Sequence, residues 1–222
     1  MTRYHLLAIL ILALLTATGA SQGPQSLFNG KNLDGWVKLH AGEWTVENGE
    51  LVARKGVAWT TNPEVSGSWL RTEKEYTDFI LELEYSVNEK GNSGVFIRSA
   101  IEKNPAFTGH EIQILDDHGR EPKKFTTGAL YDVVAPSKNM SKPANQWNTL
   151  KIEAKGPRVQ VWHNGEKIVD HTPARSLKGY LGLQNHDDKA VTRFRNIHVE
   201  VWSEHFWVLA RLWRRSRFQK TL

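Results

Sequence analysis

The residues best suited to chemistry lie in the stretch 109–117, which reads GHEIQILDD. If this stretch forms a β-strand, alternation puts Glu111 and Gln113 on one face and Asp116 at the strand exit. An acid and an amide on one strand face suit the binding of hydroxyl groups, although the solvent face of a one-sided sheet is also polar. Two further segments, NSGVFIR and GLQNH, supply similar groups. We therefore predict a concave polar sheet face on which five side chains converge: Arg98, Glu111, Gln113, Gln184 and His186.

The sequence around these residues is typical of a β protein. Asn-Gly pairs at 48–49 and 164–165 each separate two alternating runs, which is the strongest short-range signal of a two-residue hairpin. Residues 78–87 and 147–155 also alternate between apolar and polar side chains, and we expect a final strand over 191–202. Many short strands separated by turn signals predict an all-β fold, either a β-sandwich or a jelly roll.

Length and composition bound the class of protein. A chain of 222 residues is long enough for one sizeable domain. Nine Trp favour a β domain whose rings can stack on sugars, although core packing is the more common role of any single Trp. The absence of cysteine excludes disulfides and thiolate metal sites. The sequence also lacks a P-loop, a GxSxG elbow and an HExxH motif.

The two ends of the sequence differ from its middle. Residues 1–20 combine an early Arg, an apolar run and small residues, which predicts a secretory signal peptide and an exported protein, periplasmic or extracellular. Residues 21–25 read as a linker and residues 26–202 as the domain. Residues 203–222 form a basic aromatic tail, for which we weigh a short amphipathic helix that contacts a membrane, docking on the domain, or disorder.

The net charge of +5 comes mainly from this tail. The tail has one acid, Glu204, against five basic residues: Arg211, Arg214, Arg215, Arg217 and Lys220. Residues 21–202 are consequently balanced, so the basic character of the chain gives no reason to expect nucleic acid as a partner.

Nine motifs that occur in order along the chain resemble the 3-keto-disaccharide hydrolase family. The resemblance covers about residues 26–201. The motifs read FNGKNLDGW, GSWLRTEKEYTDFILELEY, GNSGVFIR, EIQILDD, GALYDVVAP, WNTLKIEAKG, VWHNGEKIVD, GYLGLQNH and FRNIHVE. The resemblance implies a concanavalin-like jelly roll in an exported bacterial protein. It also implies cleavage of 3-keto-glycosides by elimination, with hydration of the resulting 3-keto-glucal in some members. The tail after Trp202 departs from the family pattern, so the resemblance assigns it no role.

The elimination reaction that the resemblance implies suggests a role for each candidate residue. A ketone at sugar C3 acidifies the C2 hydrogen, so a base must remove it and a donor must stabilise the enolate. Glu111 or His186 is the expected base, and the permanent charge of Arg98 suits the keto oxygen. The remaining candidates are Asp116 and Tyr131 for catalysis, and Gln113, Gln184, Trp69 and His110 for substrate binding.

A divalent cation is a further expectation, because Glu111, Asp116 and His186 carry suitable ligand atoms. The expected partners are a carbohydrate or glycoside substrate and an enzyme that oxidises the sugar at C3 beforehand.

Two other functions stay open at this stage. Glu111, Gln113 and Asp116 fit the spacing of the E-x-D-x-x-E motif of retaining glycosidases, although Gln113 replaces an acid and Asp116 is shorter than Glu. A carbohydrate-binding module without turnover would use the same polar face and Trp rings.

Overall fold

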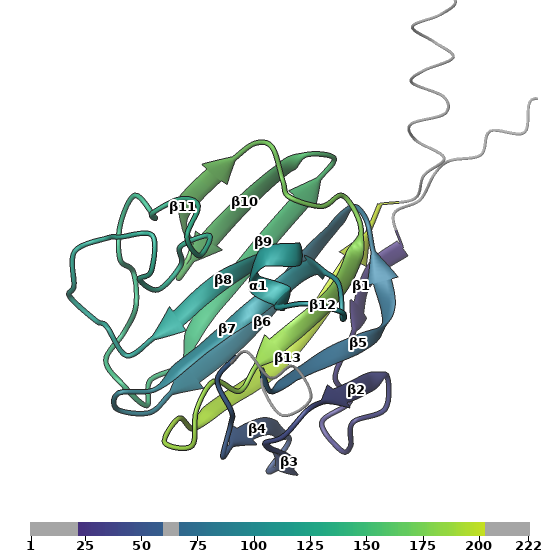
Figure 1. The fold of residues 1–222 in the computed structure, drawn as a ribbon, viewed down its shortest axis with the longest axis vertical. Coiled ribbons are helices and arrows are strands. Elements are labelled where there is room, and N and C mark those ends of the chain that lie inside the picture. The colour runs from purple at the N-terminus through teal and green to yellow at the C-terminus, as the bar shows by residue number, and fades with distance from the viewer. Residues whose placement is uncertain (1–21, 60–66, 203–222) are drawn as a thin grey trace, which may run out of the picture. The chain divides into compact units, whose positions relative to one another are not determined.

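The computed structural model describes residues 22–59 and 67–202, which form two antiparallel β-sheets (Figure 1). The predicted signal peptide, 1–20, and the basic tail, 203–222, lie outside the described residues. The larger sheet contains β11 (Glu166–His171), β10 (Arg158–His163), β9 (Asn148–Lys155), β6 (Phe79–Val87), β13 (Thr192–Val201), β4 (Glu50–Arg54) and β3 (Glu43–Glu47), with β1 (Gln22–Ser26) also paired to β13. The smaller sheet runs β2 (Trp36–Leu39), β5 (Trp69–Tyr76), β12 (Gly179–Gln184), β7 (Asn92–Ser99) and β8 (His110–Leu115).

Alternation along the strands builds the core between these sheets. On β6 every second side chain is buried, from Phe79 to Val87, and on β8 Ile112 and Ile114 are fully buried in the same apolar cluster. The other faces of the strands point away from the core. The predicted all-β jelly-roll sandwich is thus confirmed, and the smaller sheet has an outer face available for a site.

Both predicted hairpins are confirmed. Asn48 and Gly49 join β3 to β4 with φ values of 53° and 79°, and Asn164 and Gly165 join β10 to β11 with φ values of 49° and 86°. Positive φ at both central residues is the requirement of the tight hairpin turn, which Asn and Gly meet at little steric cost.

The predicted linker over residues 21–25 is wrong for the part that the structure describes. Gln22–Ser26 forms β1, which pairs with the last strand at Gln22–Val201 and Gln25–Val199, with an irregularity between them. The pairing uses backbone groups, so a composition rich in Gln, Gly and Pro concealed it.

A single short helix, α1 (Pro105–Thr108), occurs among the described residues, and it covers part of the smaller sheet (Figure 1). The side chain of Asn104 caps it by accepting a hydrogen bond from the Ala106 amide at 3.0 Å. Ala106 packs on Trp69 and Phe96 of the outer sheet face. The helix therefore forms a wall above the sheet.

Candidate active site

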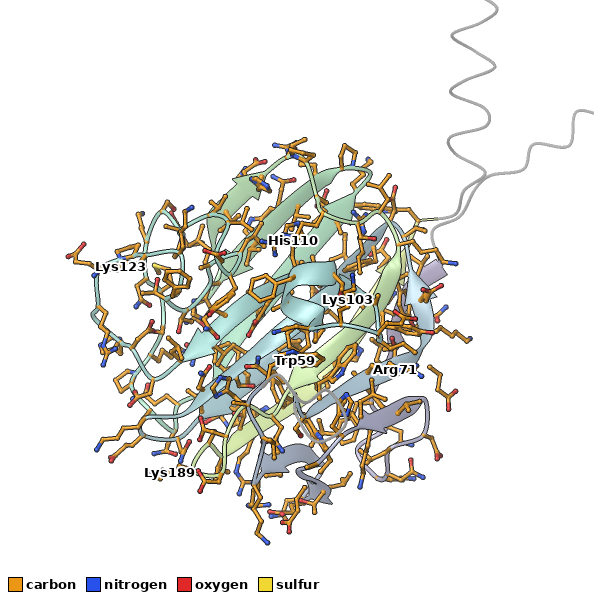
Figure 2. The ribbon with its side chains drawn as sticks, in the orientation of Figure 1. Trp59, Arg71, Lys103, His110, Lys123 and Lys189 are labelled. Carbon is orange, nitrogen blue, oxygen red and sulfur yellow. The ribbon has the colours of Figure 1, made fainter. Side chains whose placement is uncertain are left out.

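A hollow of about 180 Å³ lies on the outer face of the smaller sheet, beside α1. Trp59, labelled in Figure 2, forms part of its wall. The other lining residues are mostly polar or aromatic: Ala58, Asn92, Asn104, Ala106, Phe107, Glu111, Gln113, Tyr131, Gln184 and His186. The structure therefore brings together five of the predicted residues: Glu111, Gln113, Gln184, His186 and Tyr131.

Glu111 and Gln113 reach the hollow because β8 is a regular strand. Their side chains lie on the face opposite to Ile112 and Ile114, as alternation predicts. Both are nevertheless buried, with 3% and 5% exposure, because α1 and neighbouring loops cover the sheet. A carboxyl group has been removed from water here, which is unusual unless it serves a purpose.

Gly94 of β7 makes room for the Glu111 carboxyl. The registers Phe96–Glu111 and Gly94–Gln113 put the two strands side by side, and an added Cβ at Gly94 would collide with Oε1 of Glu111. The carboxyl thus extends across β7, where the Gln184 side chain of β12 hydrogen-bonds it.

We predict that Gly94→Ala displaces this carboxyl and lowers kcat more than it raises KM. The expected loss of kcat is about 10- to 100-fold, because displacements of about 1 Å at reacting groups have effects of this size. Gly23→Ala is the control for adding a methyl group to a glycine, because Gly23 is exposed, has no positive φ and has no atom within 4 Å of an added Cβ. Unchanged kinetics in Gly94→Ala, measured with a folded variant, would contradict the assigned geometry.

Burial raises the pKa of Glu111 to about 8, and the hydrogen bond from Gln184 offsets only part of this effect. No Lys or Arg lines the hollow in the described part of the chain. Without a cation to hold its charge, Glu111 is mostly protonated at neutral pH and is available as a proton donor.

His186 shares the hollow and is oriented by its neighbour Asp187. The ring Nδ1 lies 3.1 Å from Oδ2 of Asp187. The other oxygen, Oδ1, accepts hydrogen bonds from the amides of Lys189 and Ala190 at 3.0 and 2.8 Å, which fixes the carboxylate. If Nδ1–H donates to Asp187, then Nε2 carries the lone pair and is the ring nitrogen available to accept a proton.

Tyr131 enters the hollow on a segment that extends the sheet. Its amide donates to the Glu111 carbonyl at 2.9 Å, and the Gln113 amide donates to the Ala129 carbonyl at 3.1 Å. Burial raises the pKa of the Tyr131 hydroxyl, and the nearby Glu111 and Asp132 raise it further. The hydroxyl is therefore protonated and can donate a hydrogen bond to a ligand.

Two amide oxygens at the hollow have no hydrogen-bond partner. Oδ1 of Asn92 and Oε1 of Gln184 are both buried, and both residues line the hollow. A buried acceptor without a donor is costly, so it points to a ligand that supplies the missing donors. The hydroxyl groups of a sugar are donors of this kind.

Arg98 does not join the site, which corrects our prediction. Its side chain is 1% exposed and donates to the carbonyls of Thr77 and Gly156, both at 2.7 Å, and to Oδ1 of Asp78 at 3.1 Å. These acceptors belong to the turns between β5 and β6 and between β9 and β10. The guanidinium joins two turns and has a structural role.

We predict that Arg98→Ala destabilises the fold by about 3–5 kcal/mol, because it leaves Asp78 partly buried without its cation and two carbonyls without donors. Urea denaturation of both proteins measures the difference. Arg158→Ala, which removes an exposed ion pair with Asp170, is the control and should change little. Equal stabilities of Arg98→Ala and wild type would contradict this role.

Three further predicted residues lie away from the hollow. Trp69 is 1% exposed and packs edge-on against Phe96, so it is no stacking platform. His110 faces the opposite side of β8, where Nε2 accepts the Arg175 amide at 3.0 Å; burial, more than the nearby cationic groups, lowers its pKa to about 4. Asp116 accepts the Lys90 amide at 2.9 Å beyond the strand end.

The position of Asp116 weakens two predictions. Asp116 lies beyond the end of β8 and does not line the hollow that holds Glu111, whereas a retaining glycosidase needs both of its carboxyls, about 5–5.5 Å apart, at the scissile bond. Of the three proposed metal ligands, Glu111 and His186 line the hollow and Asp116 does not, and no group of three or more His, Asp or Glu side chains suited to a metal occurs within residues 22–59 and 67–202. The donor set that the structure shows therefore does not fit the expected cation.

Sequence reasoning missed Trp59, Asn104 and Phe107, all of which line the hollow. Trp59 comes from a stretch without strand periodicity, and the other two come from the segment around α1. The signal for Asn104 was present, because Asn followed by Pro is a typical start of a helix.

A larger hollow, of about 450 Å³, lies on the outer face of the other sheet. Lys151, in its lining, lies 3.6 Å from Glu82, and the Lys151 ammonium is 5.4 Å from the Trp162 ring centre. It has neither a buried carboxyl nor an unpartnered oxygen among its lining residues. We therefore take the smaller hollow, and not the larger one, as the candidate active site.

Comparison with known proteins supports this reading of the fold. A protein-family model described as a 3-keto-alpha-glucoside-1,2-lyase-like domain matches residues 23–200, and the chain belongs to that family. A Bacteroides thetaiotaomicron protein named 3-keto-disaccharide hydrolase is 22% identical over 232 residues, which cover 82% of this chain and 79% of that protein. The resemblance that the sequence motifs indicate is thus confirmed.

Solved structures show the same architecture. A candidate glycosyl hydrolase from Parabacteroides distasonis superposes with a TM-score of 0.68 at 24% identity, covering 82% of this chain and 95% of that one. The carbohydrate-binding module CBM66 from Bacillus subtilis superposes with a TM-score of 0.55 at 19% identity, covering 75% and 95% of the two chains. At these identities the likeness establishes the fold.

Proposed function

We propose that this chain is a carbohydrate-active enzyme that cleaves 3-keto-glycosides by removing the C2 proton and eliminating the aglycone. The family and the name of the Bacteroides relative support a glycoside-acting enzyme of this type. The observation that carries the mechanism is the presence, in one hollow, of the buried Glu111 carboxyl and of a His186 that Asp187 orients.

His186 and Glu111 each carry out one of the two proton transfers. Nε2 of His186 takes the proton from C2, and the electron pair of that bond forms an enolate with the C3 ketone. When the ketone re-forms, a double bond forms between C1 and C2 and the bond from C1 to the aglycone oxygen breaks. Glu111 gives its proton to that oxygen, so the products are a 2-hydroxy-3-keto-glucal and the free aglycone.

Other groups in the hollow assist without exchanging protons. The Tyr131 hydroxyl and the amide groups of Gln113 and Asn104 can donate to the developing enolate oxygen, in place of the cation first expected. Addition of water across C1 and C2 of the glucal would complete a net hydrolysis. The resting enzyme is restored when the proton on His186 returns to Glu111 through solvent.

The test is to incubate the protein with a 3-keto-glucoside and the matching unmodified glucoside, with and without EDTA, and to follow aglycone release. Release from the keto substrate alone, together with exchange of the C2 proton in D₂O, supports elimination. Release from the unmodified glucoside would favour direct hydrolysis, and sugar binding without release would leave a binding module. Because the substrate carries a ketone at C3, an enzyme that oxidises sugars at that position must act first.

A further inference from the structure

The surface next to the polar hollow is built from aromatic rings. Of the large hydrophobic side chains that are exposed within residues 22–59 and 67–202, two are aromatic: Phe107 at 50% and Phe125 at 49% exposure. Both contact the ring of Tyr131, with ring centres 6.2 and 5.2 Å apart. Exposed aromatic surface of this size beside a hollow is typical of a binding site.

These three rings, which we call the aromatic cluster, continue the hollow and are held in place. Phe107 and Tyr131 both line the hollow, and Phe125 contacts Tyr131 beyond it. The guanidinium of Arg175 lies 5.6 Å from the Phe107 ring centre and donates to the Ala106 carbonyl at 2.7 Å. This pair of contacts fixes the helix and its ring before any ligand binds.

The size and polarity of the hollow decide what the aromatic cluster binds. The hollow is about 180 Å³, below the roughly 300–1,000 Å³ of pockets that enclose drug-sized ligands. Its amides, from Asn92, Gln113 and Gln184, suit the sugar ring that reacts, so the other half of a glycoside must lie outside. An aromatic ring can stack on a sugar or on a flat apolar group. Phe107 and Phe125 carry no polar atom to pair with the hydroxyls of a second sugar, so they favour the flat apolar group.

We propose that the aromatic cluster is the subsite for an aromatic aglycone, so that the preferred substrates are 3-keto-glycosides of phenolic compounds. This inference rests on the function proposed above. Stacking of the aglycone on Phe107 and Phe125 would place the aglycone oxygen at the mouth of the hollow, near Glu111.

The test compares phenyl and methyl 3-keto-glucosides with the wild type, Phe107→Ala and Phe125→Ala. Both variants should raise KM for the phenyl substrate by about three- to tenfold, the range expected for one aromatic contact. Phe125 is not among the residues that line the hollow, so Phe125→Ala should in addition leave KM for the methyl substrate within about twofold. Leu177→Ala, which removes a side chain that is 57% exposed, is the matched control and should change neither value. A 3-keto-disaccharide serves as the third substrate.

Two results would overturn the aromatic subsite. One is an equal change in KM for the phenyl and methyl substrates, and the other is a larger effect on the disaccharide, which would assign the rings to a second sugar. Calorimetric binding of unmodified phenyl and methyl glucosides needs no turnover. If the protein binds phenyl glucoside more tightly than methyl glucoside, and this preference disappears in Phe125→Ala, the subsite is supported whether or not keto substrates are cleaved. Failure to cleave keto substrates would contradict the proposed function but not the subsite.

Discussion

Glu111→Gln is expected to lower kcat/KM about 10²- to 10⁴-fold for 3-keto-glycosides with poor leaving groups, the usual range for losing a proton donor. The amide keeps the shape of the side chain but cannot protonate the aglycone oxygen. A nitrophenyl aglycone needs little protonation, so its loss of rate should be much smaller. The exposed Glu121→Gln is the matched control and should behave as wild type.

The pH dependence of the wild type checks the role of Glu111. Because the acid form is the active one, kcat/KM should fall as pH rises through about 8, and this falling limb should vanish in Glu111→Gln. A wild-type rate that rises through pH 8 would contradict the assignment and would make the carboxylate the base.

Stability should respond in the same pH window. The pKa of Glu111 is raised from 4.5 to about 8 in the folded state, so its contribution to stability is full below about pH 4.5 and is lost as pH rises through about 8. Relative to wild type, Glu111→Gln should therefore gain a few kcal/mol of stability at pH 9 compared with pH 5, since each pKa unit corresponds to about 1.4 kcal/mol. Urea denaturation at both pH values measures this difference.

His186→Ala is expected to abolish exchange of the C2 proton and to lower kcat about 10²- to 10⁴-fold, because it removes the proposed base. Unlike Glu111→Gln, this variant should lose activity equally on poor and good leaving groups, since removal of the C2 proton comes before the aglycone departs. Exchange at C2 that continues in His186→Ala would contradict the assignment.

Asp187→Asn tests whether Asp187 positions the imidazole. An Asn side chain can still accept from the amides of Lys189 and Ala190, but its NH₂ group would donate to Nδ1 of His186. That would put the ring proton on Nε2 and remove the lone pair that accepts the C2 proton. We expect a lower kcat and little change in KM, with Asp188→Asn, an exposed neighbour, as the control.

The sequence predicted those parts of the site that depend on local periodicity. Alternation along β8 was sufficient to put Glu111 and Gln113 on one face, and the Asn-Gly pairs were sufficient for two hairpins. Both features are set by neighbouring residues, so they can be read from a single stretch.

The errors share a different cause. Arg98 leaves the regular strand geometry, with φ at 52°, and its acceptors at Thr77 and Gly156 are far away in sequence. Trp69 packs against Ala106 of α1 and is covered, whereas Trp59 lines the hollow, and nothing in the residues next to either ring distinguishes the two. Long-range packing of this kind has no signal in one sequence.

The segment that carries Tyr131 also affects how the protein behaves at high concentration. β8 is the last strand of its sheet, and its outward backbone groups are paired with residues 127–131, including the bonds from Gln113 to Ala129 and from Tyr131 to Glu111. An uncovered edge strand is a template on which other chains can add. The segment therefore protects the edge strand from pairing with other chains and also forms a wall of the site. Substitutions in this segment that change substrate preference must keep the edge strand covered if the protein is to stay soluble.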